Sequence, residues 1–292
     1  MDKISKKKLW IGGGTLLLLL IVAYYVFKPG VSGFEFGVAE KLMFERSIRE
    51  EGVTRIREKF TILAPVSGVM QRVAMHAGDK VQSGQAMVGI QWDAPRPVRS
   101  PINGVVLKIL REDAGPIEMG SPILEVGDPR SMEIVVDILT QDSVQVRPGM
   151  NVSITEWGGP TALSARVRTV EPQAVTRVSA LGVQEQRVRV LADLVTPPEE
   201  RAGLGDNFRV ECAIIVETIQ SALVIPVSSL FRENNSWFVY RVVNGRLKKT
   251  NVEIQTRNER HAVVTKGLNE GESLLLYPSE SARDGLKVKE EK

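Results

Sequence analysis

The sequence holds few of the side chains that most often perform chemistry: two histidines, His76 and His261, and one cysteine, Cys212. One cysteine cannot form a disulfide within the chain or supply the two or more thiolates of many zinc sites, and two histidines exclude a three-histidine metal site. A Ser-His-Asp triad stays formally open, but neither histidine lies in a recognisable catalytic motif. We interpret His76 as an exposed turn residue, His261 as the start of a strand and Cys212 as a core thiol. No enzyme is therefore expected.

The elements that would position these residues are predicted to be strands. Apolar and polar residues alternate at period two over 208–217, which is typical of a half-buried strand. Asn244-Gly245 separates two strand-like runs and predicts a type I′ hairpin, because both central residues of that turn need a positive φ. Only Thr140 to Val146 suggests a short helix after residue 30. The fold class expected for this part of the chain is mainly β.

The basic residues in excess lie at the N-terminus. The net charge is +3, but residues 1–28 carry five lysines and one aspartate, so 33 basic and 34 acidic residues remain over 29–292. Residues 29–292 therefore have a net charge of −1, and their basic and acidic residues are interspersed. Because no basic patch results, no nucleic acid partner is expected.

Residues 9–27 are uncharged and apolar over a length that a helix needs to cross a bilayer. The lysines before Leu9 predict a cytoplasmic N-terminus and an exported body. A cleaved signal peptide is the alternative, but the run is longer than usual and no Ala-x-Ala-like site follows it.

An internal repeat follows the first strands. Residues 64–90 and 100–126 align without a gap at an offset of 36. Identical residues at aligned positions are Pro65/Pro101, Gly68/Gly104, Val69/Val105 and Gly84/Gly120. A short β unit of this kind cannot bury one face alone, so the two copies should pack together as one small sandwich.

The repeat resembles the two half-motifs of a biotinyl/lipoyl domain. In carriers of that family, a lysine in the hairpin between the halves holds the biotin or lipoate. The connector here, residues 91–99, contains no lysine, and Asp93 stands about where that lysine would be. An aspartate cannot form the amide link, so we expect no cofactor. Trp92, Asp93 and Arg96 are candidate partner contacts at the exposed tip, although Trp92 could equally fold back on its own hairpin.

The order of all segments resembles a periplasmic adaptor (membrane fusion protein) of tripartite efflux systems, over roughly 34–280. Adaptors typically insert a coiled-coil hairpin between the lipoyl halves, and this nine-residue connector, with Pro95 and Pro97, is too short for one. The resemblance is therefore to a hairpinless variant. The implied order is a cytoplasmic tail (1–8), a transmembrane anchor (9–27), the first strands of the membrane-proximal domain (34–60), a split lipoyl-like domain (61–128), a β-barrel domain (130–218), the membrane-proximal domain (220–280) and a flexible tail (281–292).

This resemblance implies an adaptor subunit of an inner-membrane efflux or export transporter, of the ABC or the resistance–nodulation–division (RND) type. The lipoyl and barrel domains would form a ring, with hexamers or trimers of dimers expected. An outer-membrane channel is a further expected partner whose engagement is left open. The protein would cross the inner membrane once, with its N-terminus cytoplasmic and its body periplasmic. The alternative is a membrane-anchored envelope scaffold or transporter regulator that does not complete an export conduit.

Overall fold

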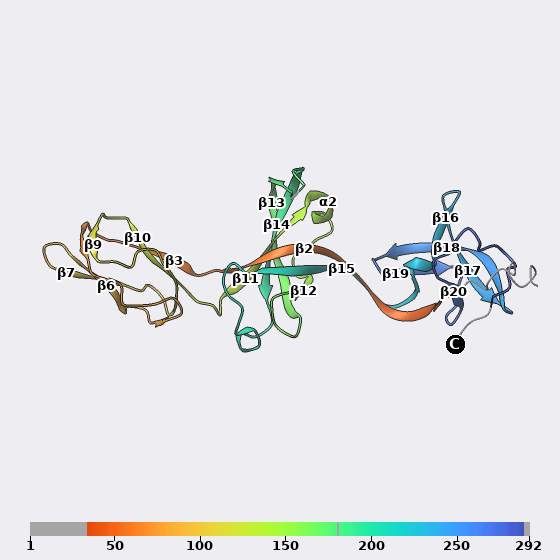
Figure 1. Ribbon diagram of the computed structural model, residues 1–292, viewed down its shortest axis with the longest axis horizontal. Helices are drawn as coiled ribbons and strands as arrows, with labels where there is room; N and C mark the ends of the chain where they lie inside the picture. Colours follow the sequence, from red (N-terminus) through yellow and green to blue (C-terminus); the bar gives the residue numbers. More distant parts are fainter. Residues whose placement is uncertain (1–33, 180, 289–292) are drawn as a thin grey trace, which may run out of the picture. The chain divides into compact units, whose positions relative to one another are not determined.

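The computed structural model describes residues 34–179 and 181–288 (Figure 1). The predicted tail 1–8 and anchor 9–27 lie outside the described residues. Within the described part, no helix combines the length and apolar character that crossing a membrane requires. Strands dominate, which confirms the mainly β fold class. The chain divides into two compact units, one formed by residues 45–219 and the other by the segments on either side of that range.

The lipoyl-like domain consists of two four-stranded sheets, and each sheet combines strands from both copies of the repeat. Their facing side chains form one core that includes Met70, Ile90, Ile123 and Leu124, all fully buried. The predicted sandwich is therefore confirmed. The first sheet has the order β3 (Lys59–Leu63), β10 (Pro122–Gly127), β8 (Gly104–Ile109), β5 (Lys80–Val81), and the second the order β7 (Pro95–Arg99), β6 (Ala86–Gln91), β4 (Gly68–Met70), β9 (Gly115–Ile117).

The repeat is longer than its sequence similarity indicates. Strands β3 and β7 are also related by the offset of 36 residues, so the predicted connector 91–99 contains a strand. Gln91 pairs with Pro95, and only Trp92, Asp93 and Ala94 link β6 to β7. Pro95 and Pro97 are accommodated in this strand because β7 lies at the edge of its sheet, where a proline without an N–H group is tolerated.

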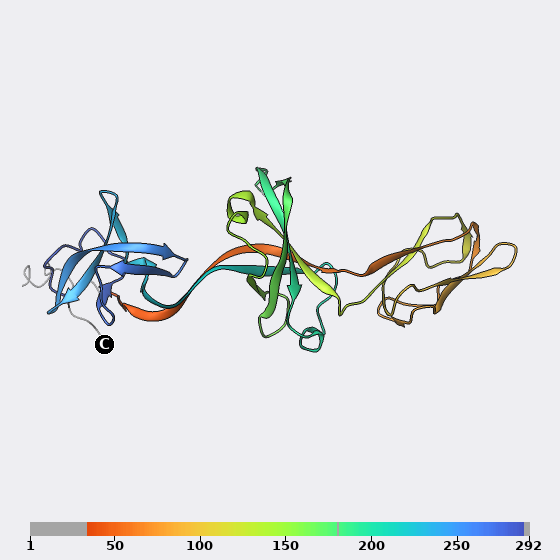
Figure 2. The same ribbon diagram turned by 180° about the vertical axis from the view of Figure 1, so that it is seen from behind.

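The rest of the unit 45–219, here called the central domain, is built on six strands. In sheet order they are β15 (Arg209–Pro226), β12 (Asn151–Thr155), β13 (Leu163–Val178), β14 (Gln184–Leu194), β11 (Met132–Leu139) and β2 (Glu40–Ile56). Because β15 also pairs with β2, these strands form a closed ring of neighbours, and Figures 1 and 2 show β2 and β15 side by side from opposite directions. Cys212 lies in the core of this domain with Ile134, Ile154 and Ile214. The predicted alternation and short helix are confirmed, the helix as α2 (Thr140–Ser143).

The second unit, here called the terminal domain, joins the start of the described chain to its end. Its strands are β1 (Phe36–Val38), β20 (Ser273–Leu275), β17 (Ser236–Val243), β18 (Arg246–Arg257), β19 (His261–Lys266) and the short β16 (Phe231–Glu233). Asn244 and Gly245 have φ values of 51° and 69°, and they join β17 to β18 as the sequence predicts. Two short 3-10 turns, η1 (Pro198–Arg201) and η2 (Val227–Ser229), complete the elements.

The segment predicted as a flexible tail, 281–292, is packed as far as the structure describes it. The side chain of Ala282 is buried, and the Tyr240 hydroxyl donates a hydrogen bond to its carbonyl oxygen at 3.1 Å. The Leu247 N–H donates to the carbonyl of Leu286, and the Val288 N–H donates to that of Gly245. Over 282–288 this segment covers an apolar surface of the terminal domain.

Candidate functional site

The residues with the most reactive side chains are kept apart by the fold. His76 is exposed in the lipoyl-like domain, with its Nδ1 3.8 Å from Asp79 Oδ2, and the Asp79 carboxylate accepts the His76 backbone N–H at 2.7 Å. Burial raises the pKa of Cys212 to about 12, so its thiol is protonated and unreactive at neutral pH. His261 begins β19 in the terminal domain. Across residues 34–179 and 181–288, no group of three or more potential ligands could hold a metal ion.

The three predicted contact residues lie at the β6–β7 hairpin. Trp92 is 60% exposed, and the Arg96 guanidinium lies over its ring, 5.5 Å from the centroid. Asp93 occupies the middle of the three-residue link and accepts the N–H of Ala94 at 2.8 Å. Trp92 thus contacts its own hairpin and still presents most of its surface to solvent. A role for these residues in partner binding stays a prediction.

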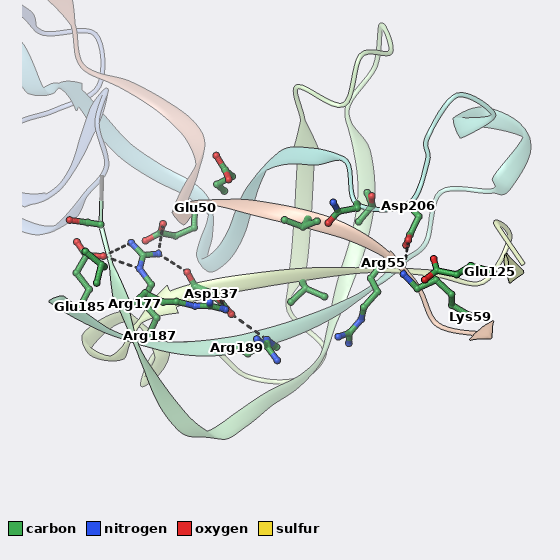
Figure 3. A pocket seen from close by; sticks show the side chains of 17 residues that line it. Glu50, Arg55, Lys59, Glu125, Asp137, Arg177, Glu185, Arg187, Arg189 and Asp206 are labelled. Atoms are coloured by element: carbon green, nitrogen blue, oxygen red, sulfur yellow. Dashed lines mark hydrogen bonds and ion pairs between the residues drawn. The ribbon is translucent and has the colours of Figure 1, made fainter. Parts of the chain in front are cut away.

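A charged groove of about 990 Å³ lies on the central domain (Figure 3). Alternate residues of a strand point to the same side, so β11 and β14 place their charges here together. The Arg187 guanidinium forms ion pairs with Glu50 at 3.0 Å and Glu185 at 2.9 Å. The Asp137 carboxylate forms ion pairs with the guanidiniums of Arg177 at 3.0 Å and Arg189 at 3.4 Å. Most charges that line this groove are therefore already paired.

Glu133 is the most buried carboxylate of this face, at 3% exposure. It accepts a hydrogen bond from Arg55 at 2.7 Å and another from Arg168, while Arg57 Nε lies 3.4 Å from its second oxygen. Burial alone would raise the pKa of Glu133, but the hydrogen bonds from the two arginines outweigh burial and hold that pKa below its ordinary value. Asp193 joins the cluster by contacts with Arg57 and Arg168.

These clusters favour a structural role over a catalytic one. The groove has six carboxylates and five cationic side chains among its lining residues, a nearly balanced set. Its one threonine, Thr54, donates its hydroxyl hydrogen bond to the carbonyl of Gly205 at 2.7 Å, so it has no adjacent base. The sequence analysis missed the network because its pairs join distant residues, such as Arg187 and Glu50, which are 137 positions apart. The only local signal is the alternation of charges along β14.

The loop between β14 and β15 holds both connections between the central and lipoyl-like domains. Arg201, 5% exposed, donates hydrogen bonds to the carbonyl oxygens of Arg130 at 3.0 Å and Thr196 at 3.2 Å. Burial lowers the pKa of this guanidinium, which binds only backbone carbonyls. Asp206 accepts the N–H of Ile56 at 2.8 Å and contacts the Lys59 ammonium at 3.0 Å. Sequence patterns gave no indication of this arrangement.

Two segments match known domain families. Residues 60–126 match the biotin/lipoyl attachment family described as "Biotin-requiring enzyme", and residues 222–290 match "YknX, C-terminal permuted SH3-like domain". A curated relative, "Putative efflux system component YknX" from Bacillus subtilis (strain 168), is 23% identical over 201 residues, which cover 66% of this chain and 51% of the relative. The chain thus spans about half the length of the curated relative that it matches.

The fold is similar to that of two solved structures. The crystal structure of MacA from Actinobacillus actinomycetemcomitans matches 83% of this chain and 100% of its own, with a TM-score of 0.61 and 15% identity. A MacA-MexA chimera that contains the Pseudomonas aeruginosa MexA α-hairpin domain matches 80% of this chain and 96% of its own, with a TM-score of 0.56 and 16% identity. Two domains of the chain are thus similar to known domain families, one of them the C-terminal domain of an efflux component, and the fold is similar to that of MacA.

Proposed function

We propose that this protein is a membrane-anchored adaptor subunit of an efflux or export transporter of the ABC or RND type. The lipoyl-like and central domains would assemble with those of further copies, as hexamers or trimers of dimers, around the exit path of the pump. Residues 9–27 would cross the inner membrane once, with the N-terminus in the cytoplasm and the body in the periplasm.

The observation that carries this proposal is the lipoyl-like sandwich without its carrier lysine. A swinging-arm carrier needs a lysine at the hairpin between the halves, and Asp93 is the central residue of the three that form this link. The module keeps a complete apolar core, so it is retained as a folded unit without the chemistry of a carrier. In a chain that also carries a C-terminal domain similar to that of an efflux component, such a module suits assembly better than catalysis.

Photo-crosslinking in native membranes tests this proposal. A benzophenone amino acid at Trp92 or Asp93 would capture what contacts the hairpin, and the same group at Val144, which is 66% exposed after α2, samples another surface. We expect crosslinks to a second copy of this chain and to a transporter subunit. If mass spectrometry finds no transporter subunit in cells that express the pump, the adaptor function is wrong.

A second function, an envelope scaffold or transporter regulator, is favoured by one observation. Three residues between β6 and β7 leave no room for a coiled-coil hairpin that could reach an outer-membrane channel. Deletion of the gene distinguishes the two functions. Increased sensitivity to exported compounds supports the adaptor, whereas an envelope defect with unchanged efflux supports the scaffold.

A further inference from the structure

Two arginines of the terminal domain stack on one tryptophan. The guanidinium carbon of Arg232, on β16, lies 5.6 Å from the centroid of the Trp237 ring. The guanidinium carbon of Arg257, at the end of β18, lies 5.5 Å from the same centroid. The Trp237 side chain is partly buried and packs against the core of the domain, so the core holds the ring that both guanidiniums contact. Stacking restricts a guanidinium and leaves its N–H edge available for a partner.

These arginines lack the acidic partners that arginines of the central domain have. Within the described residues, neither Arg232 nor Arg257 forms a salt bridge, and the Arg232 guanidinium donates a hydrogen bond to the neutral side chain of Asn235. Glu233 is occupied by Lys249, which itself lies over the ring of Phe238 at 4.7 Å. The turn after β18 adds an exposed Arg260 beside an exposed Glu259. Both guanidiniums are exposed and form no ion pair with a carboxylate among the described residues, so each can accept an oxyanion as a partner.

The sequence limits how far this site can lie from the predicted membrane anchor. The predicted anchor ends at residue 27, and Phe34 and Phe231 both pack against one buried cluster of the terminal domain. Seven residues span at most about 25 Å when fully extended. Phe231 is the neighbour of Arg232 in β16, so the length of this segment limits how far the site can lie from a bilayer that the predicted anchor crosses. Lipid phosphates are the most concentrated oxyanions at the surface of that bilayer.

We propose that Arg232 and Arg257, stacked on Trp237, bind the head groups of anionic phospholipids next to the anchor. A phosphate accepts two parallel hydrogen bonds from a guanidinium, and a head group without an amine leaves the charge of that phosphate uncompensated. This contact orients the terminal domain on the membrane. The proposal rests on the anchor of the proposed function, and an acidic segment of a partner protein is the rival oxyanion that the test must exclude.

The experiment uses the full chain in vesicles and exploits the inert thiol of Cys212. Because that thiol is buried, Gln255→Cys places a single reactive cysteine on the exposed face of β18 beside Arg257, and Ala94→Cys places a control label at the lipoyl hairpin. A fluorophore at each position is quenched by lipids with a spin-labelled head group. Vesicles contain phosphatidylcholine alone or with about 30% phosphatidylglycerol, and no transporter is present.

We expect stronger quenching at position 255 with phosphatidylglycerol, and a loss of that difference at about 0.5 M salt. A basic residue contributes about fivefold to binding an anionic surface, so Arg232→Gln with Arg257→Gln should lower the docked-to-undocked ratio roughly 25-fold. The control variant with Arg99→Gln and Arg166→Gln removes the same amount of charge outside the terminal domain. It should leave the quenching at position 255 unchanged.

Two results would overturn the proposal: equal quenching in both lipids, or unchanged quenching in the Arg232/Arg257 variant. Either result would favour an acidic protein segment as the partner. Carbonate extraction of the same vesicles tests the anchor separately, because release of the protein contradicts the predicted span, whereas retention without lipid-dependent quenching contradicts only the head-group site.

Discussion

Replacement of Glu133 by glutamine tests whether the ionic cluster of the central domain stabilises it. The substitution keeps the shape of the side chain and removes its charge, which leaves Arg55, Arg57 and Arg168 without their shared buried partner. The exposure of the four side chains sets the size of the effect. The Glu133 side chain is 4% exposed, whereas those of Arg55, Arg57 and Arg168 are 44%, 36% and 35% exposed.

Breaking a fully buried ion pair costs about 3–5 kcal/mol, and an exposed pair contributes up to about 1 kcal/mol. Because one side of this cluster is buried and the other is partly solvated, we expect Glu133→Gln to destabilise the central domain by about 2 kcal/mol at neutral pH. That change corresponds to about a 30-fold increase in the population of the opened domain. The matched control is Glu51→Gln, whose ion pair with Arg209 is 3.5 Å long and largely exposed.

The labelling rate of Cys212 measures this opening in the full chain. Cys212 is the only cysteine and is fully buried in the central core, so a thiol reagent modifies it only when that domain opens. A disulfide reagent that reacts in acid, such as a dithiodipyridine, extends the measurement to low pH. We expect labelling about 30-fold faster in Glu133→Gln than in the wild type at neutral pH, and less than about fivefold faster in Glu51→Gln.

The pH dependence gives a second check on the same reasoning. The folded protein holds the pKa of Glu133 below its unfolded value of 4.5, so the carboxylate contributes its full stability above that value. The contribution disappears as the pH falls through the lower folded pKa, because the protonated side chain no longer differs in charge from glutamine. The difference in Cys212 labelling rate between the wild type and Glu133→Gln should therefore disappear in acid. A labelling rate less than about threefold faster in Glu133→Gln at neutral pH would contradict a stabilising role of the Glu133 charge, and so would a difference that persists in acid.

Three further substitutions test separate parts of the fold. A Cβ at Gly52 would lie 2.6 Å from the Cys212 sulfur, so Gly52→Ala should cost about 1–3 kcal/mol in chemical denaturation, and Cys212→Ala in the same chain should recover part of that loss. Arg201→Met would leave three backbone carbonyls without their donor, and we expect a loss of about 2 kcal/mol and faster proteolysis near residue 130. Asn244→Ala places alanine at a φ of 51°, which should cost about 1 kcal/mol in chemical denaturation, and an unchanged midpoint would contradict the assigned role of this hairpin turn.

Features that depend on a few neighbouring residues were predictable from the sequence. Asn244-Gly245 specifies a hairpin because the turn itself requires positive φ at both positions. The offset of 36 residues predicted the sandwich because a repeated β unit must cover its apolar face with its copy. In contrast, Pro95 and Pro97 look like breakers of structure, and only the pairing of β7 at the edge of its sheet shows that they are accommodated.

The candidate sites were less predictable because most of them join residues that are distant in the sequence. Trp92, Asp93 and Arg96 could be selected from the sequence because they are neighbours in one hairpin. Nothing near Trp237 in the sequence indicates that Arg257, twenty residues later, shares its ring with Arg232. Such a contact depends on the twist and register of two strands, which side-chain patterns do not specify.

The sequence by itself determined what this protein lacks and which segments must fold together. With one cysteine and two histidines, it excludes metal sites that need two thiolates or three histidines whatever the fold, and the link around Asp93 has no lysine to carry a swinging arm. The tertiary structure alone decided which charges meet: Glu133 with three arginines, Arg201 with the backbone at Arg130, and two guanidiniums on Trp237. Residue types and spacing fix local conformation, but contacts between distant segments arise only when strand pairing brings those segments together.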